Sequence, residues 1–119
     1  MDIDPKAEDI ARENAAYNGF GQEVFTALTG NVNTDQKLMN TLRQKTYDLV
    51  CVNIVADVII ALAPTLPRLL EANSTLLLSG ILDTRLQDVL TALKQANLEV
   101  TATHATEDWR CLQARRRPL

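Results

Sequence analysis

The sequence predicts an α/β protein, an open and mainly parallel sheet with flanking helices and a closing antiparallel hairpin. Two unbroken apolar runs, residues 49–52 and 76–78, have the length of parallel strands that are covered on both faces. Between and after them, apolar residues recur at helical spacing. From residue 98 onward, two stretches alternate between apolar and polar residues with almost nothing between them, which predicts a hairpin.

The clearest helix lies near the amino terminus. Asp4 is placed to cap it, Pro5 suits its first turn, and Asn18 with Gly19 supplies the stop. Its apolar residues fall on one face: Ala7, Ile10, Ala11 and Ala15.

The remaining elements follow from the same patterns. In chain order, we expect a short strand at 23–28, a polar loop at 30–34, a weak helical turn at 38–42, a strand at 47–53, two short helices or one kinked helix at 56–63 and 64–70, a strand at 74–80, a helix at 86–96, and strands at 98–104 and 109–115. Pro64 is the reason for a kink, because proline cannot donate a hydrogen bond inside a helix. Asn97 ends the last helix.

Composition places the chain among soluble globular proteins of one domain. It has 119 residues, of which 46% are hydrophobic and 23% charged, with a net charge of −3. That charge argues against broad attraction to nucleic-acid backbones, so we expect no direct nucleic-acid binding, although three consecutive arginines at 115–117 form a local basic tail. No apolar run is long enough to span a bilayer. Cys51 and Cys111 are interpreted as buried small hydrophobic residues in a reducing cytoplasm.

Three segments carry a family resemblance. Asp2-Ile3-Asp4-Pro5, Asn53-Ile54-Val55-Ala56-Asp57 and Leu78-Ser79-Gly80-Ile81-Leu82 stand at spacings typical of S-adenosylmethionine-dependent methyltransferases. Together they resemble the family that methylates ribosomal large-subunit protein eleven, the stalk-base protein. The resemblance covers nearly the whole chain and implies a Rossmann-like class I methyltransferase sheet, with residues 1–119 forming part of the catalytic domain.

The resemblance implies roles for two residues. Asp2 matches the acidic residue at the end of the second strand, which accepts hydrogen bonds from the ribose hydroxyls of S-adenosylmethionine. Asn53 matches a cofactor-binding asparagine at the end of the fourth strand. In related amine methyltransferases, the carbonyl of that asparagine orients the substrate nitrogen. The implied reaction is methyl transfer to amino groups of a ribosomal protein, and no nucleophile from the enzyme is needed.

The family also has a glycine-rich loop after its first strand and a separate substrate-recognition domain, and neither precedes Asp2 here. Gly19 and Gly21 follow the first helix, where a helix stop explains them. We therefore expect a truncated sheet whose exposed edges favour homo-oligomers, and weak cofactor binding by the chain alone.

Two other functions are considered. A non-enzymatic remnant of the same fold would act only by association, and cofactor titration would distinguish it. A phosphoacceptor receiver domain would need a complete strand before the pair Asp2 and Asp4, and an aspartate where Asn53 stands. His104 has no metal ligands at suitable spacing and is expected in a hairpin strand, and Trp109 is expected to pack against the sheet.

Overall fold

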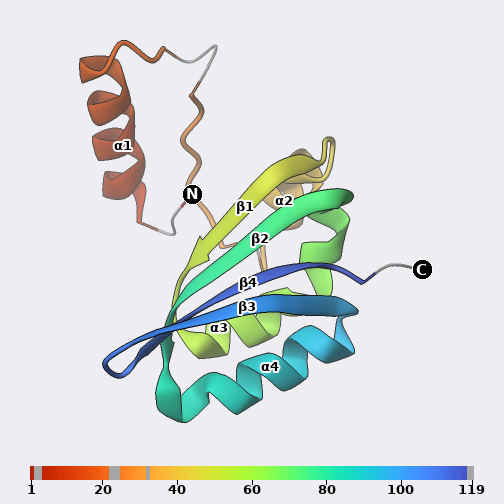
Figure 1. Ribbon diagram of the computed structural model, residues 1–119. Helices are drawn as coiled ribbons and strands as arrows, with labels where there is room; N and C mark the ends of the chain where they lie inside the picture. The colour runs from red at the N-terminus through yellow and green to blue at the C-terminus, as the bar shows by residue number, and fades with distance from the viewer. Residues whose placement is uncertain (2–3, 22–24, 32, 118–119) are drawn as a thin grey trace. The chain divides into compact units, whose positions relative to one another are not determined.

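The computed structural model describes residues 1, 4–21, 25–31 and 33–117, which fall into two compact units, residues 1–41 and 42–119 (Figure 1). The elements are α1 (Pro5–Tyr17), α2 (Gln36–Leu42), β1 (Tyr47–Asn53), α3 (Ala56–Leu62), the 3-10 helix η1 (Ala63–Leu69), β2 (Leu70–Leu82), the 3-10 helix η2 (Asp83–Arg85), α4 (Leu86–Gln95), β3 (Leu98–Thr106) and β4 (Trp109–Arg116). Among the described residues, no helix is long and apolar enough to cross a membrane.

Helix α1 begins and ends where the sequence predicts. The Asp4 carboxylate accepts a hydrogen bond from the backbone N–H of Lys6 at 2.9 Å, which satisfies one of the unpaired donors of the first turn. Asn18 is the C-cap, and Gly19 follows with a φ of +82°. The apolar face is not buried, however: no residue of α1 is buried, and Ile10 is 57% exposed.

The strand predicted at 23–28 is wrong for residues 25–28, which form no strand, while residues 22–24 lie outside the described residues. A strand needs a neighbouring strand for its N–H and C=O groups, and residues 25–28 have none. The weak helical turn at 38–42 is confirmed as part of α2, in which Leu38 and Met39 are buried.

The unit 42–119 is built on one four-stranded sheet of order β1-β2-β4-β3. Strands β1 and β2 are parallel, and β4 runs antiparallel to both of its neighbours, β2 and β3. The predicted strand at 47–53 is confirmed with the same bounds, and the predicted C-terminal hairpin is confirmed as β3 and β4. The last strand is thus inserted beside the parallel pair, as the methyltransferase resemblance implies.

Helices α3 and α4 lie side by side beneath the sheet in Figure 1. Pro64 and Pro67 both lie in η1, where the chain continues from α3 as a tighter helix because neither proline can donate a backbone hydrogen bond. The core between helices and sheet is aliphatic, and its largest fully buried side chains are Ile59, Leu66, Leu70, Leu76, Leu78, Ile81, Val89, Leu93, Leu98 and Leu112.

The expectation that β1 is covered on both faces is wrong. Only Val52 of this strand is buried, Leu49 is 53% exposed, and Cys51 is exposed rather than buried. Side chains of a strand alternate between two faces, and within residues 42–117 the helical layer covers one of them. Cys111 is half-buried.

Ser74 joins the beginnings of the two parallel strands. Their register is irregular between Tyr47 and Leu49, so the regular ladder is interrupted there. The Ser74 hydroxyl donates to the carbonyl oxygen of Tyr47 and accepts a hydrogen bond from the backbone N–H of Glu71 at 2.9 Å. This buried side chain therefore links the two strands by hydrogen bonds where their register is irregular.

Candidate functional site

The candidate site lies where the parallel strands β1 and β2 end. Their register places Asn53, the last residue of β1, opposite Ser79 of β2. In open α/β sheets, ligands bind outside the carboxyl ends of the parallel strands. Asn53 is exposed, and its side-chain amide makes no hydrogen bond within the described part of the chain. Its donors and acceptor are therefore available to a ligand.

Gly80 sits directly against this asparagine. The register between β2 and β4 shifts between Leu78 and Ile81, where β2 has one more residue than its partner, which is a β-bulge. Gly80 lies in this bulge with a φ of +79°, a conformation that residues with a Cβ rarely adopt. A Cβ added at Gly80 would stand 2.9 Å from the Oδ1 atom of Asn53 and 3.3 Å from the carbonyl oxygen of Ile54. Only glycine therefore leaves room for Asn53 in this position.

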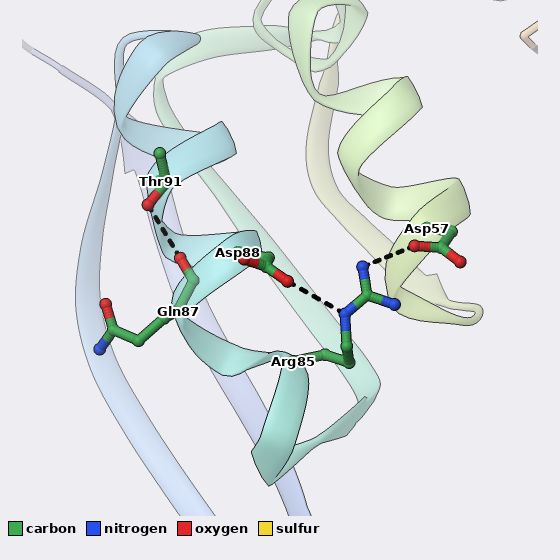
Figure 2. A network of polar contacts seen from close by, with 5 residues as sticks. All are labelled: Asp57, Arg85, Gln87, Asp88 and Thr91. Atoms are coloured by element: carbon green, nitrogen blue, oxygen red, sulfur yellow. Dashed lines mark hydrogen bonds and ion pairs between the residues drawn. The ribbon is translucent and has the colours of Figure 1, made fainter.

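Ion pairs connect the segments that follow the two strands. Figure 2 shows Arg85 of η2 between Asp57 of α3 and Asp88 of α4, with nitrogen–oxygen distances of 2.6 Å to Asp57 and 3.1 Å to Asp88. The hydrogen bond from Arg85, and secondarily its positive charge, hold the pKa of the Asp57 carboxyl below its ordinary value. These groups are exposed, so the network orients the two segments more than it stabilises the fold.

The hairpin turn is attached to the same edge of the sheet. The backbone N–H of Asp83 donates to the carbonyl oxygen of Asp108 at 2.8 Å, and Arg110 pairs with the Asp83 carboxylate at 3.1 Å. The β3–β4 turn is thereby held beside the end of β2.

Exposed apolar side chains surround this edge. Leu82, at the end of β2, is 43% exposed and pairs in register with Trp109, which is 51% exposed. Val55, two residues after Asn53, is 65% exposed. The expectation that Trp109 packs against the sheet stays a prediction, and the structure leaves about half of this side chain exposed. The sequence signal that could have indicated this is its position directly after the hairpin turn, which returns to the carboxyl end of β2.

The structure describes only one of the two residues to which the resemblance assigns a role in cofactor binding. Asn53 lies at the predicted strand end, and Asp2 lies outside the described residues. His104 lies in β3 as predicted and is exposed. Across the described ranges, no group of three or more His, Cys, Asp or Glu side chains could hold a metal ion. The edge combines exposed apolar side chains with an amide that has no hydrogen-bond partner among the described residues, a combination that suits an organic ligand.

The sheet order, the inserted antiparallel strand and the polar edge after β1 define the class: this is the fold of S-adenosylmethionine-dependent methyltransferases. Residues 1–117 match the family described as ribosomal protein L11 methyltransferase, and the chain belongs to that family. It is 30% identical over 116 residues to the ribosomal protein L11 methyltransferase of Fusobacterium nucleatum, and 35% identical over 116 residues to that of Pelobacter propionicus. In both cases the match covers 98% of this chain and 35% of the relative. The chain thus spans about a third of the length of these relatives.

Solved structures agree on the fold. The ribosomal protein L11 methylase of Lactobacillus delbrueckii subsp. bulgaricus superposes with a TM-score of 0.83 at 23% identity, over 98% of this chain and 55% of that one. A TehB-like SAM-dependent methyltransferase from Corynebacterium glutamicum superposes with a TM-score of 0.67 at 14% identity, over 98% of this chain and 65% of that one.

Proposed function

We propose that this chain forms part of the catalytic domain of an enzyme that transfers methyl groups from S-adenosylmethionine to amino groups of a ribosomal protein. The observation that carries the proposal is the exposed Asn53 amide at the end of β1, which makes no hydrogen bond to the described residues and lies directly against Gly80. The family membership supplies the cofactor and the class of substrate. When bound, S-adenosylmethionine offers a methyl group on a positively charged sulfur, which an uncharged amine accepts by in-line displacement.

Asn53 is the residue of the described chain that would position the reacting groups. Its Oδ1 atom can accept a hydrogen bond from an amine N–H and so direct the nitrogen lone pair toward the methyl carbon. Gly80 lies against that oxygen, and a Cβ at this position would stand 2.9 Å from it. Asp2 would bind the ribose hydroxyls, as the resemblance implies.

The apolar side chains at the same edge would contact the substrate and exclude water. Leu82 and Trp109 are adjacent in the β2–β4 register and expose about half of their surface. Such side chains suit the aliphatic part of a lysine side chain and exclude water from the reacting amine. The amine must be uncharged to react, and a drier environment favours its uncharged form.

The test compares two proteins. The first is the 119-residue chain, and the second is the same chain extended at its amino end by the corresponding segment of the Fusobacterium nucleatum relative. We expect the chain alone to bind S-adenosylmethionine with a Kd no tighter than about 1 mM, or ~4 kcal/mol of binding free energy, because Asn53, together with the Asp2 that the resemblance assigns to the ribose, would supply only part of the cofactor contacts of the family. The extended protein should bind at least tenfold more tightly, and calorimetry measures both.

Two variants of the extended protein separate the roles. Asp2→Ala should weaken cofactor binding, whereas Asn53→Ala should lower the rate of methyl transfer about a hundredfold, the usual cost of losing a positioning contact. Micromolar binding by the 119-residue chain alone would contradict the expectation of weak binding. An extended protein that folds but neither binds the cofactor nor transfers methyl groups would favour a non-enzymatic remnant.

A further inference from the structure

A second polar site lies at the opposite end of the sheet. A groove of about 500 Å³ runs between η1, the end of α4 and the end of β4. Three arginines line it, Arg68 from η1 and Arg116 and Arg117 from the end of β4, and the amide side chains of Gln95 and Asn97 lie on the side of α4. We propose that this groove binds a phosphate group.

The groove is separate from the candidate cofactor site. Strand β4 is antiparallel to β2, so its last residues return to the beginning of β2. There the Arg116 side chain donates from Nη1 to the carbonyl oxygen of Leu70, the first residue of β2, at 3.1 Å. Asn53 and Ser79 lie at the other end of the parallel strands. A ligand in the groove would therefore not compete with S-adenosylmethionine.

The three consecutive arginines at 115–117 have different surroundings: one is paired with a carboxylate, and the other two line the groove. Arg115 pairs with Glu99 of β3 at 3.0 Å and does not line the groove. Arg116 and Arg117 do line it, and the backbone N–H of Arg117 donates to the carbonyl oxygen of Asn97 at 2.9 Å, which holds the end of the chain against the turn after α4. Arg68 comes from a segment far earlier in the sequence, so the basic groove exists only in the folded protein.

The charge in the groove is not compensated within the described residues. No Asp or Glu lines the groove, and the guanidinium groups of Arg68 and Arg117 make no ion pair or hydrogen bond there. Four arginines outside the groove, Arg12, Arg85, Arg110 and Arg115, are each paired with a carboxylate, whereas Arg43 is unpaired among the described residues. In a protein of net charge −3, three arginines in one groove form a local positive field that attracts an anion.

A phosphate group suits this set of donors. A guanidinium presents a planar fork of N–H donors that matches two oxygens of a phosphate group, and several forks favour a ligand with more than one negative charge or several oxygens. The phosphate can belong to a free monoester or to the phosphodiester backbone of a nucleic acid, and both present the same oxygens to the arginines.

The experiment is a phosphate titration of the 119-residue chain followed by ¹⁵N–¹H NMR at constant ionic strength, with sodium chloride replaced by sodium phosphate. We expect saturable shifts at the amides of Asn97 and Arg117. Arg68→Gln and Arg117→Gln should each weaken binding about tenfold, the usual effect of losing a hydrogen bond to a charged group. Arg115→Gln is the matched control, because it removes one positive charge from the same tail at a position outside the groove. The Kd of this variant for phosphate should change less than twofold.

Parallel titrations with glycerol phosphate and with an eight-nucleotide RNA distinguish the two sources. Tighter binding of the RNA, lost in Arg68→Gln and Arg117→Gln, assigns the groove to a phosphodiester backbone, and equal or tighter binding of glycerol phosphate assigns it to a monoester. The proposal is overturned if shifts do not saturate, or if Arg115→Gln weakens binding as much as Arg68→Gln. It is also overturned if the groove variants only lower the melting temperature, because the arginines would then serve to stabilise the negative end of the α4 dipole.

Discussion

Gly80 is the position at which a single methyl group should disturb the candidate site most. Two costs add in Gly80→Ala. A residue with a Cβ at a φ of +79° costs roughly 1–2 kcal/mol in backbone strain. The new Cβ would also stand 2.9 Å from Oδ1 of Asn53, so this side chain would have to leave its present rotamer at a cost of about 0.5–1.5 kcal/mol.

We therefore expect Gly80→Ala to lower the free energy of unfolding by about 1.5–3.5 kcal/mol, measured by urea denaturation followed by circular dichroism. Gly19→Ala is the control for backbone strain alone, because Gly19 has a φ of +82° and a Cβ there would meet no atom within 4 Å. It should cost no more than roughly 1–2 kcal/mol.

The contact itself is tested by a double-mutant cycle. Asn53→Ala removes Oδ1, so the cost of Gly80→Ala should be smaller in the Asn53→Ala background than in the unmodified chain, by about 0.5–1.5 kcal/mol. Additive effects of the two substitutions, or a Gly80→Ala protein as stable as the original, would refute the reasoning that Gly80 makes room for Asn53.

The remaining predictions concern stability, pH and association. Ser74→Ala should destabilise the fold by about 1–3 kcal/mol in urea denaturation, because it removes the two hydrogen bonds that the buried hydroxyl makes with the backbone of Tyr47 and Glu71. Thr91→Ala, which removes only an exposed hydrogen bond to the carbonyl oxygen of Gln87, should change stability by less than about 0.5 kcal/mol, and equal costs for the two would contradict the role of Ser74. The folded-state pKa of Asp57 is lowered, so its contribution to stability is present above the unfolded pKa and is lost as the pH falls through the lowered value. An NMR titration should place the pKa of Asp57 below its ordinary value, and Arg85→Gln should raise this pKa back to the ordinary value. A pKa of Asp57 that stays lowered in Arg85→Gln would show that Arg85 is not the cause. We expect the chain to self-associate through the exposed edge strand β1, and Leu49→Lys should shift sedimentation toward the monomer; a stable monomer at all concentrations of the unmodified chain would contradict this.

Much of the fold could be predicted because its signals are local. The bounds of β1 coincide with the predicted strand at 47–53, and α1 begins after the predicted cap, Asp4. A cap, a proline or an apolar repeat acts on residues within a turn or two of itself, so these patterns identify an element without knowledge of its neighbours.

Predictions about covering layers were less successful. The apolar run at residues 49–52 is typical of a strand that is buried on both faces. The side chains of Leu49 and Cys51 in this run are nevertheless exposed. Trp109 is a large aromatic residue that could be expected to be covered, yet about half of its side chain is exposed at the hairpin. Burial depends on what packs against each face, and a single apolar run does not contain that information.

The sequence by itself determined the class of fold, the order of most of its elements and, through motif resemblance, the family, and it singled out Asn53 as a candidate cofactor residue. Only the tertiary structure decided what surrounds that residue. Gly80 is 27 positions from Asn53 in the chain, and the two meet because of the β1–β2 register and the bulge in β2. Arg68 likewise joins Arg116 and Arg117 only because antiparallel pairing returns β4 to the beginning of β2. Contacts of this kind depend on strand pairing across the whole sheet, whereas propensity and periodicity describe a few neighbouring residues.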